Sequence, residues 1–415
     1  MVRLEKRFVL GGGVFLWFYS LLLYIMFSLY IFYTLTPFRF TTIKDYPHTS
    51  TNAYFHHPIT SIYNNTCNLF DGRWVKDEDG PLYSNLSRKS IPLNRNCLLN
   101  GRNDMDYLYW RWKPEGCHLP RFDSKAFLCH VKGKTMAFIG DSFGRNHIES
   151  LLCMLSTEDI PREVYKDEED KFRTWQFPHH NFTLLFLRSN FLLFGKERII
   201  NGSFTGGFHL HMDKLDNNWT QKLPNIDLAI FSVAHWFSRP NYLYKGGKLI
   251  GCVNCGEPNL KAFSPGFSIR KAYRVTFEYV NESRKGIVVF LKTFSFAQFE
   301  NGGWNRGGFC NRTKGFTREN VSFGGDGWKY RNIQVEEIER AKKYGQKSEN
   351  KFEILDVTRM MLMRPDGHPG EFWKNKSRKG YNDCLHWCLP GPIDTWSEIL
   401  LHIMIGKNVT PITRL

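Results

Sequence analysis

One stretch of sequence indicates the fold: Lys134-Thr-Met-Ala-Phe-Ile-Gly-Asp-Ser-Phe-Gly-Arg-Asn146. Its first seven residues form a short, mainly apolar run, which is typical of a buried strand. Apolar residues then recur at helical spacing, at Ile148, Leu151, Leu152 and Leu155. A strand that passes through a tight turn into a helix predicts an α/β fold.

The same alternation of strand and helix continues along the chain. Further buried-strand patterns occupy residues 184–187, 227–233, 287–293 and 352–357, and further helical patterns occupy 332–344 and 393–404. We therefore expect an α/β fold with a mostly parallel sheet that helices cover on both faces.

Ser142 lies at the turn, where open α/β sheets place their active sites. Its hydroxyl would lie near the first N–H groups of the helix, which can hold a developing oxyanion. Gly140 is expected to let the backbone turn tightly, and Gly144 to keep the first helical turn accessible. The triplet Gly-Asp-Ser by itself is equally compatible with a simple turn that caps a helix.

A serine nucleophile needs a base, and Asp383-Cys-Leu-His386 supplies a candidate near the C-terminus. An aspartate three residues before a histidine can bring its carboxylate to Nδ1, which leaves Nε2 free to take the serine proton. A rival pair is Asp366-Gly-His368, although its glycine and the following proline also suit a structural corner.

The N-terminus indicates a membrane anchor. Arg3, Lys6 and Arg7 precede an uncharged, aromatic-rich run over residues 12–35, which is roughly long enough to cross a 30 Å hydrocarbon core. A cleaved signal peptide is the alternative, but its apolar region would be shorter and would end in small residues. We expect a cytosolic tail at 1–11, an anchor at 12–35 and a stem at 36–62, with the rest of the chain lumenal.

Two features support a secretory compartment. All ten cysteines follow the expected anchor, in a compartment where disulfides persist. Ten N-x-S/T sequons are candidate glycosylation sites, at Asn64, Asn85, Asn181, Asn201, Asn218, Asn281, Asn311, Asn320, Asn375 and Asn408. The net charge of +16 would ordinarily suggest nucleic acid, but the basic residues are spread along the chain and this compartment argues against that partner.

The lumenal part divides by composition into a Cys- and Trp-rich segment at 63–123 and a catalytic domain at 124–415. Cys252 and Cys255 could join Cys384 and Cys388 in a zinc site. Disulfides are the better expectation in an oxidising lumen, so we expect no bound metal.

Several blocks of sequence resemble the plant trichome birefringence-like family, whose members are Golgi polysaccharide O-acetyltransferases related to the SGNH/GDSL esterases. The similar blocks are Cys67–Trp74, Cys97–Asp104, Trp110–Cys117, Gly140–Asn146, Phe299–Trp304, Arg364–Pro369 and Asp383–Gly391. They span nearly the whole lumenal part, which makes the resemblance far more specific than a lone Gly-Asp-Ser.

The resemblance implies an SGNH/GDSL-like fold with Ser142 as nucleophile, His386 as general base and Asp383 as its orienting acid. An acetyl-serine would form from an acetyl donor, such as acetyl-CoA or another carrier, with no bound cofactor. A hemicellulose hydroxyl would then accept the acetyl group. The similarity to the branch that includes the xyloglucan acetyltransferases favours xyloglucan as acceptor, and mannan is an alternative.

Disulfides are also implied by the resemblance. It predicts Cys67–Cys117 and Cys97–Cys153, each of which would stabilise the fold by about 2–4 kcal/mol. We further expect Cys310 to bond Cys384 or Cys388, and Cys129 to be an unpaired buried thiol.

Six further residues are candidates for holding the oxyanion or the substrate, namely Gly140, Asp141, Arg145, Asn146, His235 and Trp236. Arg145 could bind a donor phosphate or the acceptor, or could pair with a structural carboxylate. His235 and Trp236 could line the cleft or simply pack. Ala234 stands where the family usually has a glycine, which calls into question a backbone contact with the oxyanion there.

Three functions are compatible with these residues. The first is acetyl transfer in the Golgi lumen, and the second is an esterase that uses the same triad but lets water attack the acetyl-enzyme. The third is a non-catalytic wall-polymer binder with aromatic and basic residues, which would have no need of an activated serine and its base.

Overall fold

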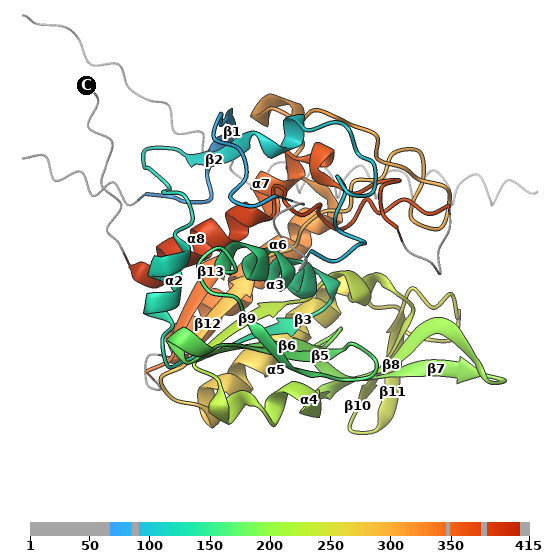
Figure 1. Cartoon of the computed structure of the whole chain (residues 1–415). Coiled ribbons are helices and arrows are strands. Elements are labelled where there is room, and N and C mark those ends of the chain that lie inside the picture. The colour runs from blue at the N-terminus through green and yellow to red at the C-terminus, as the bar shows by residue number, and fades with distance from the viewer. Residues whose placement is uncertain (1–66, 85–90, 346–348, 375–379, 407–415) are drawn as a thin grey trace, which may run out of the picture. The chain divides into compact units, whose positions relative to one another are not determined.

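The computed structural model describes residues 67–84, 91–345, 349–374 and 380–406 (Figure 1). These residues belong to one unit, which spans 64–415. Within those ranges, no helix is long and apolar enough to span a bilayer. The expected tail, anchor and stem at 1–62 lie outside the described residues.

The central sheet has seven strands. Their order is β13 (Lys351–Leu355), β12 (Val288–Lys292), β9 (Leu228–Ser232), β3 (Thr135–Gly140), β6 (Phe182–Arg188), β5 (Phe172–Phe177) and β4 (Arg162–Lys166). The first five run parallel, whereas β5 and β4 extend the sheet as antiparallel strands. The expected mostly parallel α/β sheet is confirmed, and the two edge strands were not predicted.

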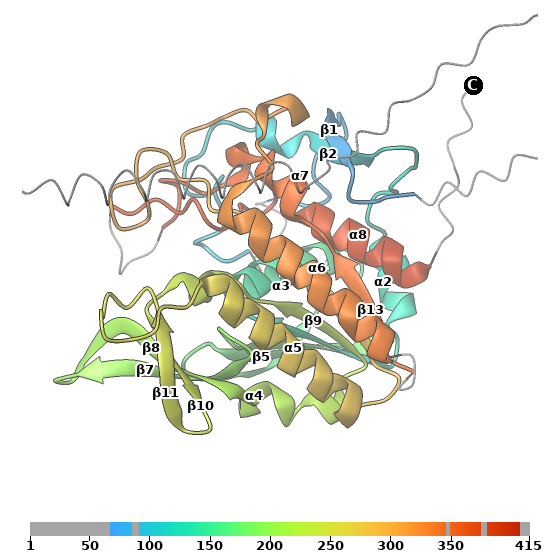
Figure 2. The same ribbon diagram turned by 180° about the vertical axis from the view of Figure 1, so that it is seen from behind.

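Helices cover both faces of this sheet because the buried residues of β3 alternate between two cores. Met136 and Phe138 pack with α2 (Ser124–His130), α3 (Ser142–Leu155) and α8 (Asp394–Ile405). Ala137 and Ile139 pack on the opposite face with α5 (Pro265–Ser283) and α6 (Gly325–Gly345), which Figure 2 shows lying side by side. Two shorter helices are α4 (Asn217–Thr220) and α7 (Thr358–Leu362).

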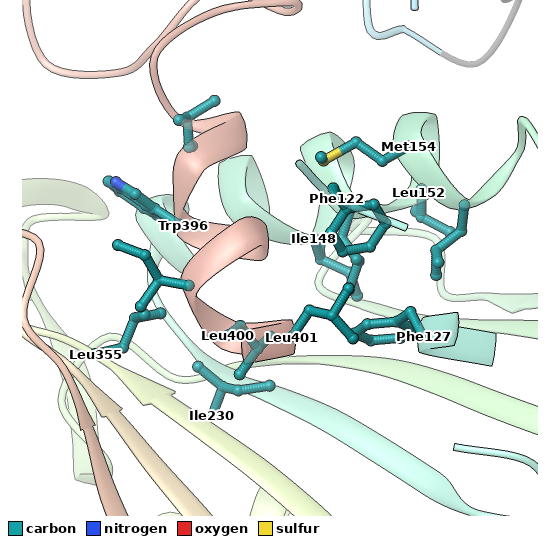
Figure 3. Packing of buried hydrophobic residues seen from close by; sticks show 14 of the residues in the cluster. Phe122, Phe127, Ile148, Leu152, Met154, Ile230, Leu355, Trp396, Leu400 and Leu401 are labelled. Atoms are coloured by element: carbon teal, nitrogen blue, oxygen red, sulfur yellow. The ribbon is translucent and has the colours of Figure 1, made fainter. Parts of the chain in front are cut away.

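Helix α8 ties the C-terminal part of the chain to the first core. Figure 3 shows Trp396, Leu400 and Leu401 of α8 directed toward side chains from α2, α3 and the sheet. Trp396 is fully buried, as is Ile148 of α3. The residues just before α8 are therefore held close to the start of α3, which is where a site assembled from both helices must form.

A second sheet of four strands was not predicted. Its order is β11 (Lys248–Val253), β10 (Asn241–Lys245), β8 (Ser203–Leu215) and β7 (Leu193–Ile200). Strands β7 and β8 form a long antiparallel hairpin that projects beside the central sheet (Figure 1). Much of the hairpin is exposed, so it lacks the apolar run that identifies a buried strand.

The N-terminal segment folds around a small antiparallel pair of strands, β1 (Gly72–Lys76) and β2 (Trp110–Pro114). Trp74 and Trp112 meet edge to face across it, with ring centres 5.8 Å apart. A disulfide joins Cys67 to Cys117, as expected. The segment is thus a loop-rich unit held by a disulfide and an aromatic pair.

The partner of Cys97 differs from the prediction. Cys97 is bonded to Cys388, with a Cα–Cα distance of 5.7 Å, and not to Cys153. Leu389 donates a backbone hydrogen bond to the Arg95 carbonyl over 2.9 Å, so residues 95–97 lie against residues 388–389. Cys153 instead lies buried in the first core, on α3.

The remaining cysteines settle the other expectations. Cys310 bonds Cys384, as one of the two expected pairings. Cys252 bonds Cys255, so the four-sulfur zinc set is wrong, because these thiols are consumed in disulfides. Cys129 forms no disulfide in the described part of the chain, but it is exposed on α2 and not buried as we expected.

The sequons lie mostly on the surface. Five of their asparagines are exposed, namely Asn181, Asn201, Asn218, Asn311 and Asn320. Asn281 is half-buried and its amide donates to the Ala341 carbonyl. The other four lie outside the described residues.

The Cys97–Cys388 bond can be tested by peptide mapping without reduction, which should recover this pair and no Cys97–Cys153 peptide. Cys97→Ala and Cys388→Ala should each lower the free energy of unfolding by about 2–5 kcal/mol. Because both remove the same bond, the double variant should cost little more than either single one. Additive losses in chemical denaturation would contradict the pairing.

Candidate active site

The proposed nucleophile occupies the first position of α3. Asp141 is the N-cap, and its Oδ1 accepts a hydrogen bond from the Phe143 N–H over 3.0 Å. Ser142 is partly exposed, whereas Asp141 and Phe143 on either side are buried. The turn therefore places Ser142 at the carboxyl end of β3, in the first turn of a helix whose N-terminus favours negative charge.

The glycines of this turn act differently from the expectation. A Cβ at Gly140 would lie 2.2 Å from the Ser232 carbonyl oxygen of β9, so a side chain is excluded by the neighbouring strand. Gly140 is thus required by close packing and not by a left-handed turn conformation. A Cβ at Gly144 would meet its nearest neighbour, Ser232, at 3.7 Å, so no close contact demands glycine there.

The expected acid–base pair is formed. His386 Nδ1 lies 2.9 Å from Oδ2 and 3.1 Å from Oδ1 of Asp383, and the carboxylate also accepts from the backbone N–H of His386 over 3.0 Å. An ionised carboxylate accepts only, so Nδ1 carries the proton and Nε2 has the free lone pair. In the described residues, Nε2 is buried and has no hydrogen-bond partner.

A third group, Arg95, completes the pair and was not predicted. Its Nη1 donates to Asp383 Oδ2 over 2.7 Å, and the two side chains are only 8% and 6% exposed. Burial alone would raise the pKa of Asp383, but the neighbouring His386 and Arg95 lower it far below its usual range. Asp383 is therefore an anion, as an acid that orients a histidine must be.

The two halves of the site meet through Asn146 and Phe143. The Asn146 amide accepts from the Trp387 N–H over 2.8 Å and donates to the Trp387 carbonyl over 3.3 Å. The Phe143 and His386 rings have centres 5.4 Å apart. Since these residues adjoin or nearly adjoin Ser142, the N-terminus of α3 and the His386 loop share one site, and Asn146 fixes their relative position.

The rival pair does not have the geometry of a catalytic pair. Asp366 accepts two hydrogen bonds from buried Arg364, each 2.9 Å long. His368 Nδ1 lies 2.7 Å from the His386 carbonyl oxygen, and its ring stacks on Trp387 with centres 4.1 Å apart. Burial lowers the pKa of His368 to about 4, so its ring is neutral. Its role is to pack against the His386 loop and to hydrogen-bond the backbone of that loop.

His235 packs directly against the nucleophile turn. Its ring lies between Phe143 and Phe294, with centres 4.3 and 4.5 Å away, and its Nε2 donates to the Ser295 carbonyl over 2.8 Å. Burial, followed by the charge of Lys292, lowers its pKa to about 3. Ala234 has a φ of −167°, an extended value that any residue adopts, so the alanine is accommodated without strain.

Arg145 is engaged in ion pairs. Its Nε donates to Glu149 over 2.9 Å, and its Nη2 donates to the Asp170 carboxylate over 2.7 Å. A further donor, Nη1, binds the Asp170 carbonyl over 2.7 Å. This arrangement corresponds to the structural alternative, in which Arg145 joins α3 to the β4–β5 turn.

Comparison with known proteins assigns two consecutive parts of the chain. Residues 119–403 match the profile described as PC-Esterase, a GDSL/SGNH-like acyl-esterase family found in Pmr5 and Cas1p. The chain belongs to the PC-Esterase family. Residues 65–118 match the PMR5 N-terminal domain, so Arg95 and the strand pair β1–β2 belong to that preceding domain.

The relatives of this PC-Esterase protein are named acetyltransferases and trichome birefringence-like proteins. Xyloglucan O-acetyltransferase 4 of Populus trichocarpa is 49% identical over 387 residues, which cover 91% of this chain and 89% of that protein. Xyloglucan O-acetyltransferase 2 of Arabidopsis thaliana is 49% identical over 81% of this chain and 82% of its own length. Protein trichome birefringence-like 24 of Arabidopsis thaliana is 41% identical, with 82% of each chain covered.

The PC-Esterase site contains a buried cation that sequence reasoning missed. Lys292, at the end of β12, is 3% exposed, and its ammonium lies 4.7 Å from the ring centre of Phe143 and 4.9 Å from that of Trp396. Burial lowers its pKa to about 8, and the charge of Asp141 opposes part of that effect. Nothing in its sequence context distinguishes Lys292 from a lysine that merely ends a strand.

Removing Arg95 should damage stability and activity together. Arg95→Met leaves the Asp383 carboxylate buried beside one cation fewer, which should cost about 3–5 kcal/mol of unfolding free energy. Loss of the Arg95 charge favours proton uptake by the Asp383–His386 pair, so the acid limb of the pH–rate profile should move to higher pH. The wild-type pair stabilises the fold above about pH 4, and this contribution is lost as pH falls toward the lowered pKa.

The matched control for Arg95 is Arg73→Met. Arg73 pairs with Glu115 in the same N-terminal segment at 3.8 Å, but these side chains are 63% and 55% exposed. An exposed pair contributes about 0–1 kcal/mol, so this variant should leave both measurements nearly unchanged. Equal effects of the two substitutions would contradict a special role for Arg95.

Lys292 should leave a signature in the pH dependence of stability. Above about pH 8 the native lysine loses its proton, whereas the unfolded lysine keeps its proton until about pH 10. The unfolding free energy of the wild type should therefore rise by about 2–3 kcal/mol relative to Lys292→Met between pH 8 and 10. Lys285→Met is the control, because Lys285 is exposed. If the difference in unfolding free energy between the wild type and Lys292→Met is the same at pH 8 and pH 10, the assignment is refuted.

Proposed function

We propose that this protein transfers an acetyl group from a donor to a hydroxyl of a hemicellulose, namely xyloglucan, through an acetyl-Ser142 intermediate. The observation that carries the proposal is the Asp383–His386 pair, hydrogen-bonded over 2.9 Å beside the start of α3, in a PC-Esterase chain. The names of the relatives that cover most of the chain support acetyl transfer to xyloglucan.

In the first half-reaction Ser142 attacks the donor. His386 Nε2 takes the hydroxyl proton while the serine oxygen forms a bond to the acetyl carbonyl carbon. The tetrahedral intermediate collapses when the bond to the donor's leaving group breaks, and the leaving group takes the proton from His386. The products are acetyl-Ser142 and the free carrier, and His386 is neutral again.

In the second half-reaction the acceptor attacks acetyl-Ser142. His386 takes the proton of a sugar hydroxyl, whose oxygen bonds to the acetyl carbon, and the bond to the serine oxygen then breaks. The serine recovers its hydrogen from His386. N–H groups at the start of α3 favour the negative charge that develops on the acetyl oxygen in both steps.

The surrounding charges suit this cycle. Each step creates an imidazolium on His386, and the Asp383 anion, held by Arg95, stabilises that cation through the 2.9 Å contact at Nδ1. Arg95 keeps Asp383 ionised, so the acid does not compete for the proton that His386 must return.

We further propose that the reaction takes place in the Golgi lumen, with the chain anchored by residues 12–35 in type II orientation. The apolar run after Arg3, Lys6 and Arg7 supports this topology, and the sequons support a lumenal catalytic part. The donor is acetyl-CoA or another acetyl carrier. Digestion of sealed Golgi vesicles with protease should spare residues 67–415 and so tests the topology.

The experiment that tests the activity compares wild type, Ser142→Ala and His386→Ala with an acetyl donor and unacetylated xyloglucan oligosaccharides. Mass spectrometry should find acetylated oligosaccharide only with the wild type, and the variants should lose about 10³-fold or more of the rate. Retention of full activity by Ser142→Ala would exclude the mechanism.

An esterase with the same residues is the second candidate, because the family description includes acyl-esterases. It differs only in that water takes the place of the sugar hydroxyl. Incubation with acetylated xyloglucan and no donor should release acetate slowly or not at all. Steady release of acetate at a rate that does not fall when unacetylated xyloglucan is added would favour the esterase.

A further inference from the structure

Three side chains, those of Trp236, Arg239 and Trp304, form a surface that we call the aromatic platform. The guanidinium carbon of Arg239 is 4.9 Å from the ring centre of Trp236 and 5.2 Å from that of Trp304. Trp304 is 50% exposed, whereas Trp236 and Arg239 are half-buried. An indole that stays this exposed while a cation holds it in place offers an apolar face to a ligand.

The platform continues directly from the candidate active site. Trp236 follows His235, whose ring stacks at 4.3 Å on Phe143, the residue after Ser142. The Trp236 ring also packs edge to face against Phe208, with ring centres 5.5 Å apart. The platform is therefore linked, through His235 and Phe143, to the turn that carries Ser142.

The loop that carries Trp304 has a fixed shape. Glu300 and Phe309 exchange two backbone hydrogen bonds, of 2.7 and 3.1 Å, so residues 300–309 form a closed loop. Inside it, Gly302 has a φ of +130°, and a Cβ there would lie 2.7 Å from the Arg306 carbonyl oxygen. A glycine is needed at this position, and it lets the backbone close tightly beneath the indole.

The same loop is attached at both ends to the segment that carries the general base. Before the loop, the Gln298 N–H donates to the Cys384 carbonyl over 2.9 Å. After the loop, Cys310 forms its disulfide with Cys384. Cys384 lies between Asp383 and His386 in the sequence. The loop that carries Trp304 is therefore fixed in position relative to the histidine that would activate the acceptor.

We propose that the aromatic platform is the acceptor subsite, where one sugar of a neutral polysaccharide stacks on Trp304 and places a neighbouring sugar at Ser142. This inference rests on the proposed function and names where its second substrate binds. The flat C–H face of a pyranose is neutral and apolar, so it matches an exposed indole, and the hydroxyls at its rim can accept from a guanidinium.

The exposed fractions favour a sugar over the donor. The platform's own cation, Arg239, is half-buried and stacked on two indoles, whereas the Trp304 indole is open, and this suits the face of a sugar better than the phosphate of a carrier. The platform should therefore determine the affinity for acceptor and leave the formation of acetyl-Ser142 unchanged.

Trp304→Ala tests the subsite in two separate measurements on the full chain. The first is calorimetric binding of an unacetylated xyloglucan oligosaccharide to the Ser142→Ala protein, with and without Trp304→Ala, which should weaken about tenfold. The second is hydrolysis of a small aryl acetate, which reports attack by Ser142 without an acceptor and should be unchanged. Trp304→Phe should recover most of the oligosaccharide affinity, because a smaller ring still stacks.

The matched control is Tyr344→Ala. Tyr344 is 65% exposed and carries a stacked arginine, Arg340, at 4.9 Å. It lies near the end of α6, beside the start of β13 and so at the amino ends of the parallel strands, whereas Ser142 follows the carboxyl end of β3. Its removal should therefore leave oligosaccharide binding unchanged.

Unchanged oligosaccharide binding in Trp304→Ala would overturn the subsite, as would a loss confined to the aryl acetate reaction. These outcomes are separate from failure of the proposed function, in which the wild type binds the oligosaccharide but acetylates no acceptor. Binding that weakens in Trp304→Ala supports the subsite whether or not transfer is observed.

Discussion

The buried ion pair between Arg95 and Asp383 determines how the rest of the site is organised. A carboxylate that is 6% exposed remains charged only where cations and N–H donors surround it, and Asp383 receives them from Arg95, from His386 and from the backbone of its own turn. Since Asp383 then fixes the tautomer and orientation of the His386 ring, the geometry of the base depends on an arginine that is 288 residues from Asp383 in the sequence.

This dependence makes the N-terminal segment part of the catalytic unit. The PMR5 N-terminal match ends at residue 118, and the PC-Esterase match begins at 119, yet the pair Arg95–Asp383 and the disulfide Cys97–Cys388 both cross that boundary. Arg102 adds further links, since its guanidinium donates to the carbonyl oxygens of Asp366 and His368. Two sequence domains therefore build one active site.

Sequence patterns predicted those parts of the fold whose signal is local. The parallel strands β3, β9 and β12 are almost fully buried, so each reads as an apolar run, and β6 and β13 keep enough buried apolar residues to show the same signal. The pair Asp383–His386 is only three residues apart in sequence. The exposed hairpin β7–β8 lacks such a run. Lys292 and Arg95 were missed because what distinguishes them is their three-dimensional surroundings: two aromatic rings in one case and a distant carboxylate in the other.

The cysteines illustrate the same limit. Cys67–Cys117 was predictable from the resemblance, but the partner of Cys97 was misassigned, because the packing of residues 95–97 against 388–389 leaves no trace in the spacing. Likewise Asn146 was a candidate for chemistry on the basis of its place near Ser142. Its amide instead forms hydrogen bonds with both the N–H and the carbonyl of Trp387, and these bonds hold helix α3 and the His386 loop together.

The long span of the Cys97–Cys388 bond has a consequence for biosynthesis. Its cysteines are 291 residues apart, so at about 5–20 residues per second the first thiol waits roughly 15–60 seconds for the ribosome to produce its partner. Cys117, Cys129 and Cys153 all emerge during that interval and can capture Cys97 in a wrong bond. Any bond that Cys97 forms with another thiol during that interval must be exchanged before the native pair can form.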